Sequence, residues 1–432
     1  MRISVRSHDA RRARDLQEAL GVAGIDSVAL VGPVHERTRL QDDIALIDAA
    51  PTALAWACDE ARRIAHSASR PIAIVAASRA EDPPVEDASA FDAWIQIDAP
   101  EGVLEQELTS IQRRAAARTE LLRRIETARA LGVATPAPEP NTPWRALYIG
   151  DPSPFFLAQE RALAALDGRL EAAFSSFMGF DFLHDARFDA VTLNATRDAA
   201  TALALCGALR RNARLHHLPT AVIVNRDDDA TVIGAVDRGA TLIVHPDEAP
   251  EPKLRWLFDK VRRGRRHAHV EAGLAALKCS CAGRAGLFDP GFFTEHLTRL
   301  SEAAHLSGRP LTLVALRACL APGARLANDV DWRRSIDQIA ELAGRLVRAH
   351  DGAALVLEDV IAIALPESSV AEGRRTAERV SGVVECTAFA SGEGGVGPIV
   401  LEHSVVELNA GESGRGLLAR ALDPFPAEGA RA

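Results

Sequence analysis

The feature that most constrains the fold is an internal duplication. Short apolar runs alternate with helical patterns in the first 133 residues, and the same rhythm returns after residue 143. The runs span residues 3–5, 27–31, 44–47, 72–76 and 94–97, and then 146–149, 172–174, 190–193, 221–224 and 241–244. Apolar strands separated by helices are typical of a parallel sheet with helices on both faces. The sequence therefore predicts two α/β domains, each with a parallel five-stranded sheet.

Landmarks repeat between the two copies. Asp48 and Asn194 each end the third run, Pro71 and Pro219 each precede the fourth, and Pro100 and Pro246 each follow the fifth. Between the copies lies a proline-rich run, 134–143, which is unfavourable to helix and sheet interiors and reads as a stiff linker. Apolar residues at helical spacing predict a long helix from Glu101 to about Leu131.

The last third of the chain has a different pattern. A helix ending near residue 306 precedes a strand at 311–316, a helix at 335–347, an apolar hairpin at 354–365 and a helix at 370–380. This order predicts an α+β domain with a mostly antiparallel sheet. The predicted segments are 1–133, 134–143, 144–268, a connector at 269–284, and 285–432.

Composition narrows the class of partner. The net charge is −9, whereas a nucleic-acid-binding protein usually carries net positive charge or a concentrated basic face. No apolar stretch reaches the roughly 18 residues of a membrane helix, and the polar start does not resemble a signal peptide. We therefore expect a cytoplasmic protein without membrane insertion. Cys279 and Cys281 are the only close pair among six cysteines and lack further ligands, so no metal site is expected.

The segment 44–51, Ile-Ala-Leu-Ile-Asp-Ala-Ala-Pro, resembles the phosphoacceptor segment of response-regulator receiver domains. The resemblance implies two receiver-like domains of the CheY/flavodoxin-like fold. It makes Asp48 a candidate phosphoacceptor, standing at the strand end where functional residues of such sheets lie.

Other residues of the receiver machinery are missing. Family members hold Mg²⁺ with an acidic pair after the first strand and carry a hydroxyl residue and a lysine at the ends of strands four and five. In the first copy the acidic pair aligns with Ser7 and His8 (with Asp9 one place late), the hydroxyl position with Ala76 and the lysine with Ala99. In the second copy the phosphoacceptor position is Asn194, the strand-four position is Asn225, and His245 replaces the lysine. Phosphoryl transfer needs a metal and cations to neutralise charge. We therefore favour receivers that dimerise or dock, with a phosphorylation-gated regulator as an alternative.

Two receivers followed by such an α+β domain resemble the PleD-type proteins, whose last domain is a GGDEF (nucleotidyl-cyclase-like) diguanylate cyclase. In this chain the GGDEF turn aligns with 357–361, Leu-Glu-Asp-Val-Ile, so both glycines that let a nucleotide approach are replaced. Arg317 stands at the position of a metal-binding aspartate, although Mg²⁺ needs oxygen ligands. The resemblance therefore implies a degenerate domain that is not an enzyme.

The inhibitory site of these cyclases is retained. Arg348-Ala-His-Asp351 matches the Arg-x-x-Asp motif that binds cyclic di-GMP, and Arg379 falls at the family's second ligand-binding arginine. At the end of a helix, residues three apart share a face. The guanidinium of Arg348 could then donate to guanine O6 and N7 or to phosphate, and the carboxylate of Asp351 could accept from guanine N–H groups. Arg145 is a candidate for completing the ligand site.

The resemblance implies a cyclic di-GMP effector that acts as a homodimer through its receivers. It further implies an adaptor in cell-cycle-dependent proteolysis, which delivers CtrA through RcdA to the ClpXP protease at a cell pole. The alternatives are a residual diguanylate cyclase, a GTP-binding PleD-type regulator, and a scaffold that binds no nucleotide.

Overall fold

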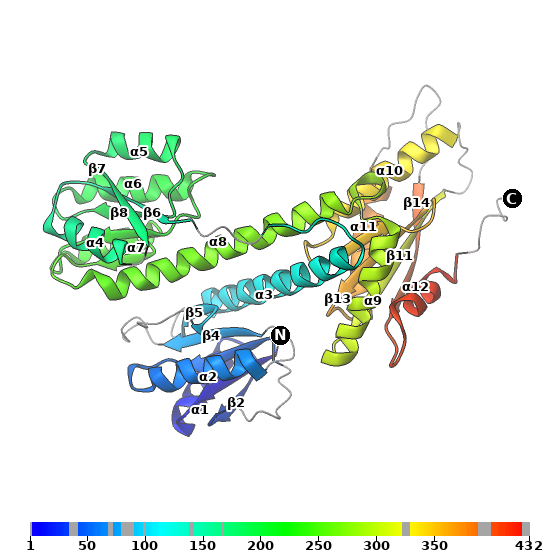
Figure 1. The fold of residues 1–432 in the computed structure, drawn as a ribbon, viewed down its shortest axis with the longest axis horizontal. Helices are drawn as coiled ribbons and strands as arrows, with labels where there is room; N and C mark the ends of the chain where they lie inside the picture. The colour runs from blue at the N-terminus through cyan, green and yellow to red at the C-terminus, as the bar shows by residue number, and fades with distance from the viewer. Residues whose placement is uncertain are drawn as a thin grey trace. The chain divides into compact units, whose positions relative to one another are not determined.

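The computed structural model describes residues 2–33, 42–67, 72–78, 90–97, 101–137, 142–165, 167–321, 329–387 and 399–425. Its contacts define two units (Figure 1). The first contains Met1–Gln112 and Glu139–His267, and the second contains Arg113–Pro138 and Ala268–Ala432. The predicted landmarks Pro71, Ala99 and Pro100 lie outside the described residues.

The first parallel sheet has the strand order β2-β1-β3-β4-β5. Its elements are β1 (Ile3–Ser7), α1 (Ala10–Val22), β2 (Ser27–Val31), β3 (Ile44–Asp48), the short helix η1 (Pro51–Ala53), α2 (Leu54–Ser67), β4 (Ala73–Ser78) and β5 (Ala93–Gln96). Every residue of β1, β3 and β4 is buried. Such strands read as continuous apolar runs because helices cover both faces of a parallel sheet.

The second sheet repeats this topology, with the order β10-β9-β8-β6-β7. Its elements are β6 (Trp144–Ile149), α4 (Pro154–Ala164), β7 (Gly168–Ala173), α5 (Ser176–Asp185), β8 (Ala190–Asn194), α6 (Ala199–Arg211), β9 (Thr220–Ile223), α7 (Asp229–Asp237) and β10 (Leu242–Val244). Numbered within each copy, both sheets have the order 2-1-3-4-5, which is that of flavodoxin and CheY. The predicted pair of receiver-like folds is confirmed.

Two long helices follow the two sheets. The predicted helix near 101–131 is α3 (Glu101–Ala130), and it ends where Gly132 takes a left-handed conformation with φ of 68°. Helix α8 (Pro250–Ser280) continues through most of the predicted connector. Within the first unit, Arg265 of α8 donates to the carbonyl of Thr142 at 2.8 Å and to Oδ1 of Asp189 at 2.7 Å.

The C-terminal domain is the predicted α+β fold, with an antiparallel sheet in the order β12-β13-β11-β14. Its elements are η3 (Arg284–Gly286), α9 (Pro290–Ser307), β11 (Leu311–Leu320), α10 (Asp329–Leu346), β12 (Gly352–Leu355), β13 (Val360–Pro366), α11 (Val370–Glu385), β14 (Ile399–Glu407) and α12 (Gly414–Leu422). Sequence reasoning placed neither β14 nor α12. The predicted fold class, two α/β domains followed by an α+β domain, is confirmed.

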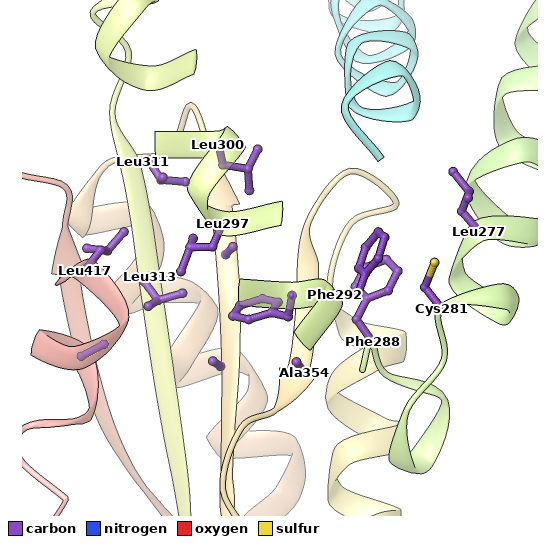
Figure 2. Packing of buried hydrophobic residues seen from close by; sticks show 14 of the residues in the cluster. Leu277, Cys281, Phe288, Phe292, Leu297, Leu300, Leu311, Leu313, Ala354 and Leu417 are labelled. Carbon is purple, nitrogen blue, oxygen red and sulfur yellow. The ribbon is translucent and has the colours of Figure 1, made fainter. Parts of the chain in front are cut away.

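One core cluster joins the sheet of this domain to the two long helices (Figure 2). Leu277 of α8 and Cys281 lie at one side of the cluster beside Phe288 and Phe292, whose ring centroids are 4.9 Å apart. Leu121 of α3 belongs to the same buried cluster. The second halves of α3 and α8 are therefore part of the folded C-terminal domain.

Candidate functional site

The Arg-x-x-Asp motif forms a tight turn rather than the end of a helix. Helix α10 ends at Leu346, so the prediction that Arg348 and Asp351 share a helical face is wrong. The backbone N–H of Asp351 donates to the carbonyl of Arg348 at 3.0 Å, and the backbone N–H of Arg348 donates to Oδ2 of Asp351 at 2.9 Å. Aspartate side chains that bond a nearby backbone N–H in this way compete with helix.

Asp351 is almost entirely buried, with 3% of its side chain exposed. Its Oδ1 accepts no hydrogen bond from any described residue, and Nε2 of His350 lies 4.0 Å away. Burial raises the pKa of Asp351, although His350 and Arg348 favour the charged form. A buried oxygen without a partner is costly, so this atom can gain much from a ligand that donates to it.

The structure brings the predicted second arginine to the same turn. Arg379 is an exposed residue of α11, and its Nη2 donates to the carbonyl of Leu346 at 3.1 Å. Leu346 is the last residue of α10 and lies two positions before Arg348, which is also exposed. Two arginines therefore stand at the surface of the turn, while Asp351 points inward.

A small cavity of about 80 Å³ lies behind the turn. Its lining residues are Arg124, Lys278, Leu287, Phe288, Gly344, Val347, Arg348, Ala349, Asp351 and Ala353. Sequence reasoning missed Arg124 and Lys278, because both belong to helices that precede the domain in the chain. The scarcity of lysine offered a signal, since Lys278 is the only lysine after residue 260.

Arg124 belongs to a buried polar network. It is 2% exposed, its Nε donates to Oε1 of Glu120 at 2.6 Å, and its Nη2 donates to the carbonyl of Asp351 at 3.0 Å. The same Oε1 lies 2.9 Å from Nε2 of His296, and Nδ1 of that ring lies 3.1 Å from the hydroxyl of Thr127. Burial by itself would raise the pKa of Glu120, but His296 and Arg124 lower it to about 2. The network fixes α3 to the turn.

At the turn that aligns with the GGDEF motif, Arg317 forms an ion pair with Asp359. The turn lies between β12 and β13, and Nε of Arg317 on β11 is 3.1 Å from Oδ2 of Asp359. The two side chains are 17% and 11% exposed. Leu357, at the first position of the turn, is 45% exposed. Among the described residues, no three His, Cys, Asp or Glu side chains are placed to hold a metal ion.

In the first receiver-like domain, Asp48 lies at the end of β3 and is fully buried. The guanidinium of Arg12 makes bidentate hydrogen bonds to the carboxylate of Asp48, from Nε to Oδ2 at 2.8 Å and from Nη2 to Oδ1 at 2.9 Å. The hydroxyl of Ser7 also donates to Oδ2 at 2.8 Å. Asp9 instead caps helix α1 by accepting from the backbone N–H groups of Arg11 and Arg12. Sequence reasoning missed Arg12, and the role of Asp48 as phosphoacceptor stays a prediction.

The second receiver-like domain holds Asn194 at the equivalent place. Its Nδ2 donates to the hydroxyl oxygen of Tyr148 at 2.9 Å and to the carbonyl of Asp151 at 3.0 Å. Arg145 lies on β6, and its guanidinium donates to Glu171 at 2.9 and 2.6 Å. A part for Arg145 in the ligand site stays a prediction.

Comparison with known proteins returned solved structures only. No family model and no curated protein matches the sequence. The GGDEF domain of DgcB from Caulobacter crescentus in complex with c-di-GMP is 19% identical, covers 33% of this chain and 83% of its own, and has a TM-score of 0.28. The FimX GGDEF domain from Pseudomonas aeruginosa is 16% identical, covers 33% and 90%, and has a TM-score of 0.28.

A putative response regulator from Chloroflexus aurantiacus is 19% identical, covers 28% of this chain and 100% of its own, and has a TM-score of 0.26. Each of these structures covers about one domain of this chain, so the fold class rests on the sheet topologies. In the described part of the chain, no helix has both the length and the apolar character needed to cross a membrane.

Proposed function

We propose that this chain is a non-catalytic effector that binds cyclic di-GMP at the turn formed by Arg348 and Asp351. The observation that carries the proposal is the buried Oδ1 of Asp351, which accepts no hydrogen bond within the described part of the chain and lies next to two exposed arginines, Arg348 and Arg379. Guanine presents N–H donors that suit a carboxylate and the acceptors O6 and N7 that suit a guanidinium. The phosphates of the ligand suit arginine as well.

The proposal excludes synthesis of the ligand. Catalysis of phosphoryl transfer needs a divalent metal, whose oxygen ligands must be free to bind it. In this chain the carboxylate of Asp359 in the turn is already paired with the guanidinium of Arg317. Arg317 also brings positive charge to the position where the metal would have to bind, which supports a domain that senses the nucleotide rather than makes it.

A second part of the proposal concerns what the protein does when cyclic di-GMP is bound. The arrangement of two degenerate receivers and a degenerate GGDEF domain resembles PopA, a PleD paralogue. We infer by this resemblance an adaptor that dimerises through its receivers, is recruited to a cell pole, and delivers CtrA through RcdA to ClpXP. The Arg12 pair supports receivers that work without phosphorylation, because the carboxylate of Asp48 is already held by a cation.

Calorimetric titration of the full chain with cyclic di-GMP tests the binding site. We expect the wild type to bind and Arg348→Ala to lose binding while it keeps the thermal transition of the wild type. Arg345→Ala is the matched control, because Arg345 is an exposed arginine of α10 that pairs with Glu341 and does not line the cavity. Equal affinities for Arg348→Ala and the wild type would refute the site, and conversion of GTP by the wild type would refute the non-catalytic assignment.

Reconstituted proteolysis tests the adaptor role. We expect ClpXP to degrade CtrA faster when RcdA, this chain and cyclic di-GMP are all present, and Arg348→Ala to remove the acceleration. Degradation at the same rate with and without this chain would refute the adaptor role and leave the binding site unaffected.

A further inference from the structure

The cavity behind the turn contains a cation that the proposed function does not use. Lys278 lies near the end of α8 and lines the cavity together with Gly344 and Asp351. We infer that Lys278 is a ligand-binding residue that donates to guanine O6 while Asp351 accepts from N1–H and N2–H on the same base edge. This inference rests on the proposed function and adds the determinant of base specificity.

The ammonium group of Lys278 has N–H donors that described residues do not use. Its ammonium makes one long hydrogen bond, 3.4 Å to the carbonyl of Gly344, and no other bond or ion pair with a described residue. A lysine carries three N–H donors, so two remain for a group that enters the cavity. The side chain is partly buried, and a charge there gains more from an acceptor than a fully solvated charge does.

The other cation behind the turn is already engaged. Arg124 donates to Glu120 and to the carbonyl of Asp351, and its guanidinium lies 4.9 Å from the centroid of the Phe288 ring. Arg124 therefore positions the turn and one wall of the cavity. Between these two cations, Lys278 is the one whose donors are not all used by described residues.

The size and walls of the cavity indicate what enters it. At about 80 Å³ the cavity is well below the roughly 300 Å³ at which ordinary ligand pockets begin, so it suits the edge of a base and not a whole nucleotide. Leu287, Phe288, Val347 and Ala353 supply apolar walls. The sugar and phosphates would remain outside, where Arg348 and Arg379 are exposed.

The pairing of groups selects guanine over adenine. A donor, Lys278, and an acceptor, Oδ1 of Asp351, line the same small space. Guanine presents an acceptor, O6, next to the donors N1–H and N2–H, whereas adenine presents a donor at N6 next to an acceptor at N1. Adenine would therefore set donor against donor and acceptor against acceptor.

The test is titration of the full chain with cyclic di-GMP and cyclic di-AMP, with GTP as a third ligand that carries guanine outside a cyclic dinucleotide. We expect Lys278→Met to weaken cyclic di-GMP binding by about 10- to 100-fold, as expected for losing a hydrogen bond to a charged group. We expect no loss for cyclic di-AMP, so the ratio of the two affinities should narrow. Arg415→Met, which removes an exposed charge on α12, should leave both affinities unchanged.

A second variant obstructs the cavity without removing charge. A Cβ at Gly344 would lie 2.8 Å from Cδ2 of Leu287 and 3.7 Å from Nζ of Lys278. Gly344 lies within α10, where alanine favours the helix, so Gly344→Ala should fold and bind cyclic di-GMP more weakly.

The outcomes separate the two proposals. Wild-type affinity and base selectivity in both Lys278→Met and Gly344→Ala, together with loss of binding in Arg348→Ala, would overturn the role of Lys278 and preserve the proposed function. Failure of the wild type to bind cyclic di-GMP would overturn both. Equal affinity of the wild type for GTP and cyclic di-GMP would support the base-edge site and contradict a dedicated dinucleotide effector.

Discussion

Replacement of Arg124 by methionine should destabilise the C-terminal unit more than any loss of surface charge. Arg124 and Glu120 are each 2% exposed and are joined at 2.6 Å, so the variant leaves a buried carboxylate with one partner fewer. It also removes the 3.0 Å donor to the carbonyl of Asp351. Breaking a buried pair by deleting one partner costs about 4 kcal/mol. The methionine retains most of the volume of the side chain, so little of this cost should come from an empty space.

Native-state hydrogen exchange measures the effect within the unit. We expect the most protected amides of α9 to exchange about a thousand-fold faster in Arg124→Met, which corresponds to about 4 kcal/mol of lost stability. Arg129→Met is the matched control, since Arg129 is exposed in the last turn of the same helix, and exchange should change little.

The double variant Glu120→Gln with Arg124→Met separates the buried charge from the lost packing. A neutral amide at position 120 removes the unpaired charge, so the double variant should be more stable than Arg124→Met alone. A double variant that is less stable than the single one would refute the reasoning, because the cost would then not arise from an uncompensated carboxylate. Unchanged exchange in Arg124→Met would refute it as well.

Three further predictions concern charged groups. Arg12→Ala should destabilise the first receiver-like domain by about 2 kcal/mol, because Asp48 loses two charge-assisted hydrogen bonds and keeps those from Ser7 and from the backbone N–H of Ala50. Urea denaturation followed by far-UV circular dichroism would measure the loss. The lowered pKa of Glu120 adds stability that is complete above pH 4.5 and is lost as the pH falls toward about 2. The loss should approach about 3 kcal/mol and be absent in Glu120→Gln, and a common acid transition for both chains would contradict it. Arg317→Ala should cost about 1–3 kcal/mol by leaving the mostly buried Asp359 without its cation, and restoration by Arg317→Ala with Asp359→Asn in thermal melts would confirm the cause.

The positions of the strands could be predicted from the sequence, and the contacts of the arginines could not. Apolar runs such as Ile44–Asp48 are buried on both faces of a parallel sheet and therefore stand out. Strand β14, Ile399–Glu407, is interrupted by the consecutive exposed residues Glu402 and His403, so it lacks a continuous apolar run. Arg12 and Arg124 lie in arginine-rich helices, where the sequence does not distinguish a paired guanidinium from a solvated one.

The candidate site was found by spacing and changed by tertiary contacts. Arg348 and Asp351 have helical spacing in sequence, but the carboxylate of Asp351 bonds the backbone N–H of Arg348 and closes a turn. The third lining cation, Lys278, comes from a helix that starts in the other contact unit. No local pattern predicts that such a residue lines the cavity behind the turn, because the pairing depends on how α8 packs on the C-terminal core.

The contact between Arg265 and Thr142 has a consequence for the order of folding. The C-terminal unit is discontinuous, since its first segment, Arg113–Pro138, is synthesised before the whole of Glu139–His267 and its remaining partners come after. Closing a long flexible loop costs conformational entropy. Once the second receiver-like domain has folded, Arg265 and Thr142 are joined at 2.8 Å, so the chain enters and leaves that domain at neighbouring points. The folded second receiver-like domain thereby holds the two chain segments close together and shortens the loop that the C-terminal unit must close. A variant that prevents this domain from folding should slow the assembly of the C-terminal unit.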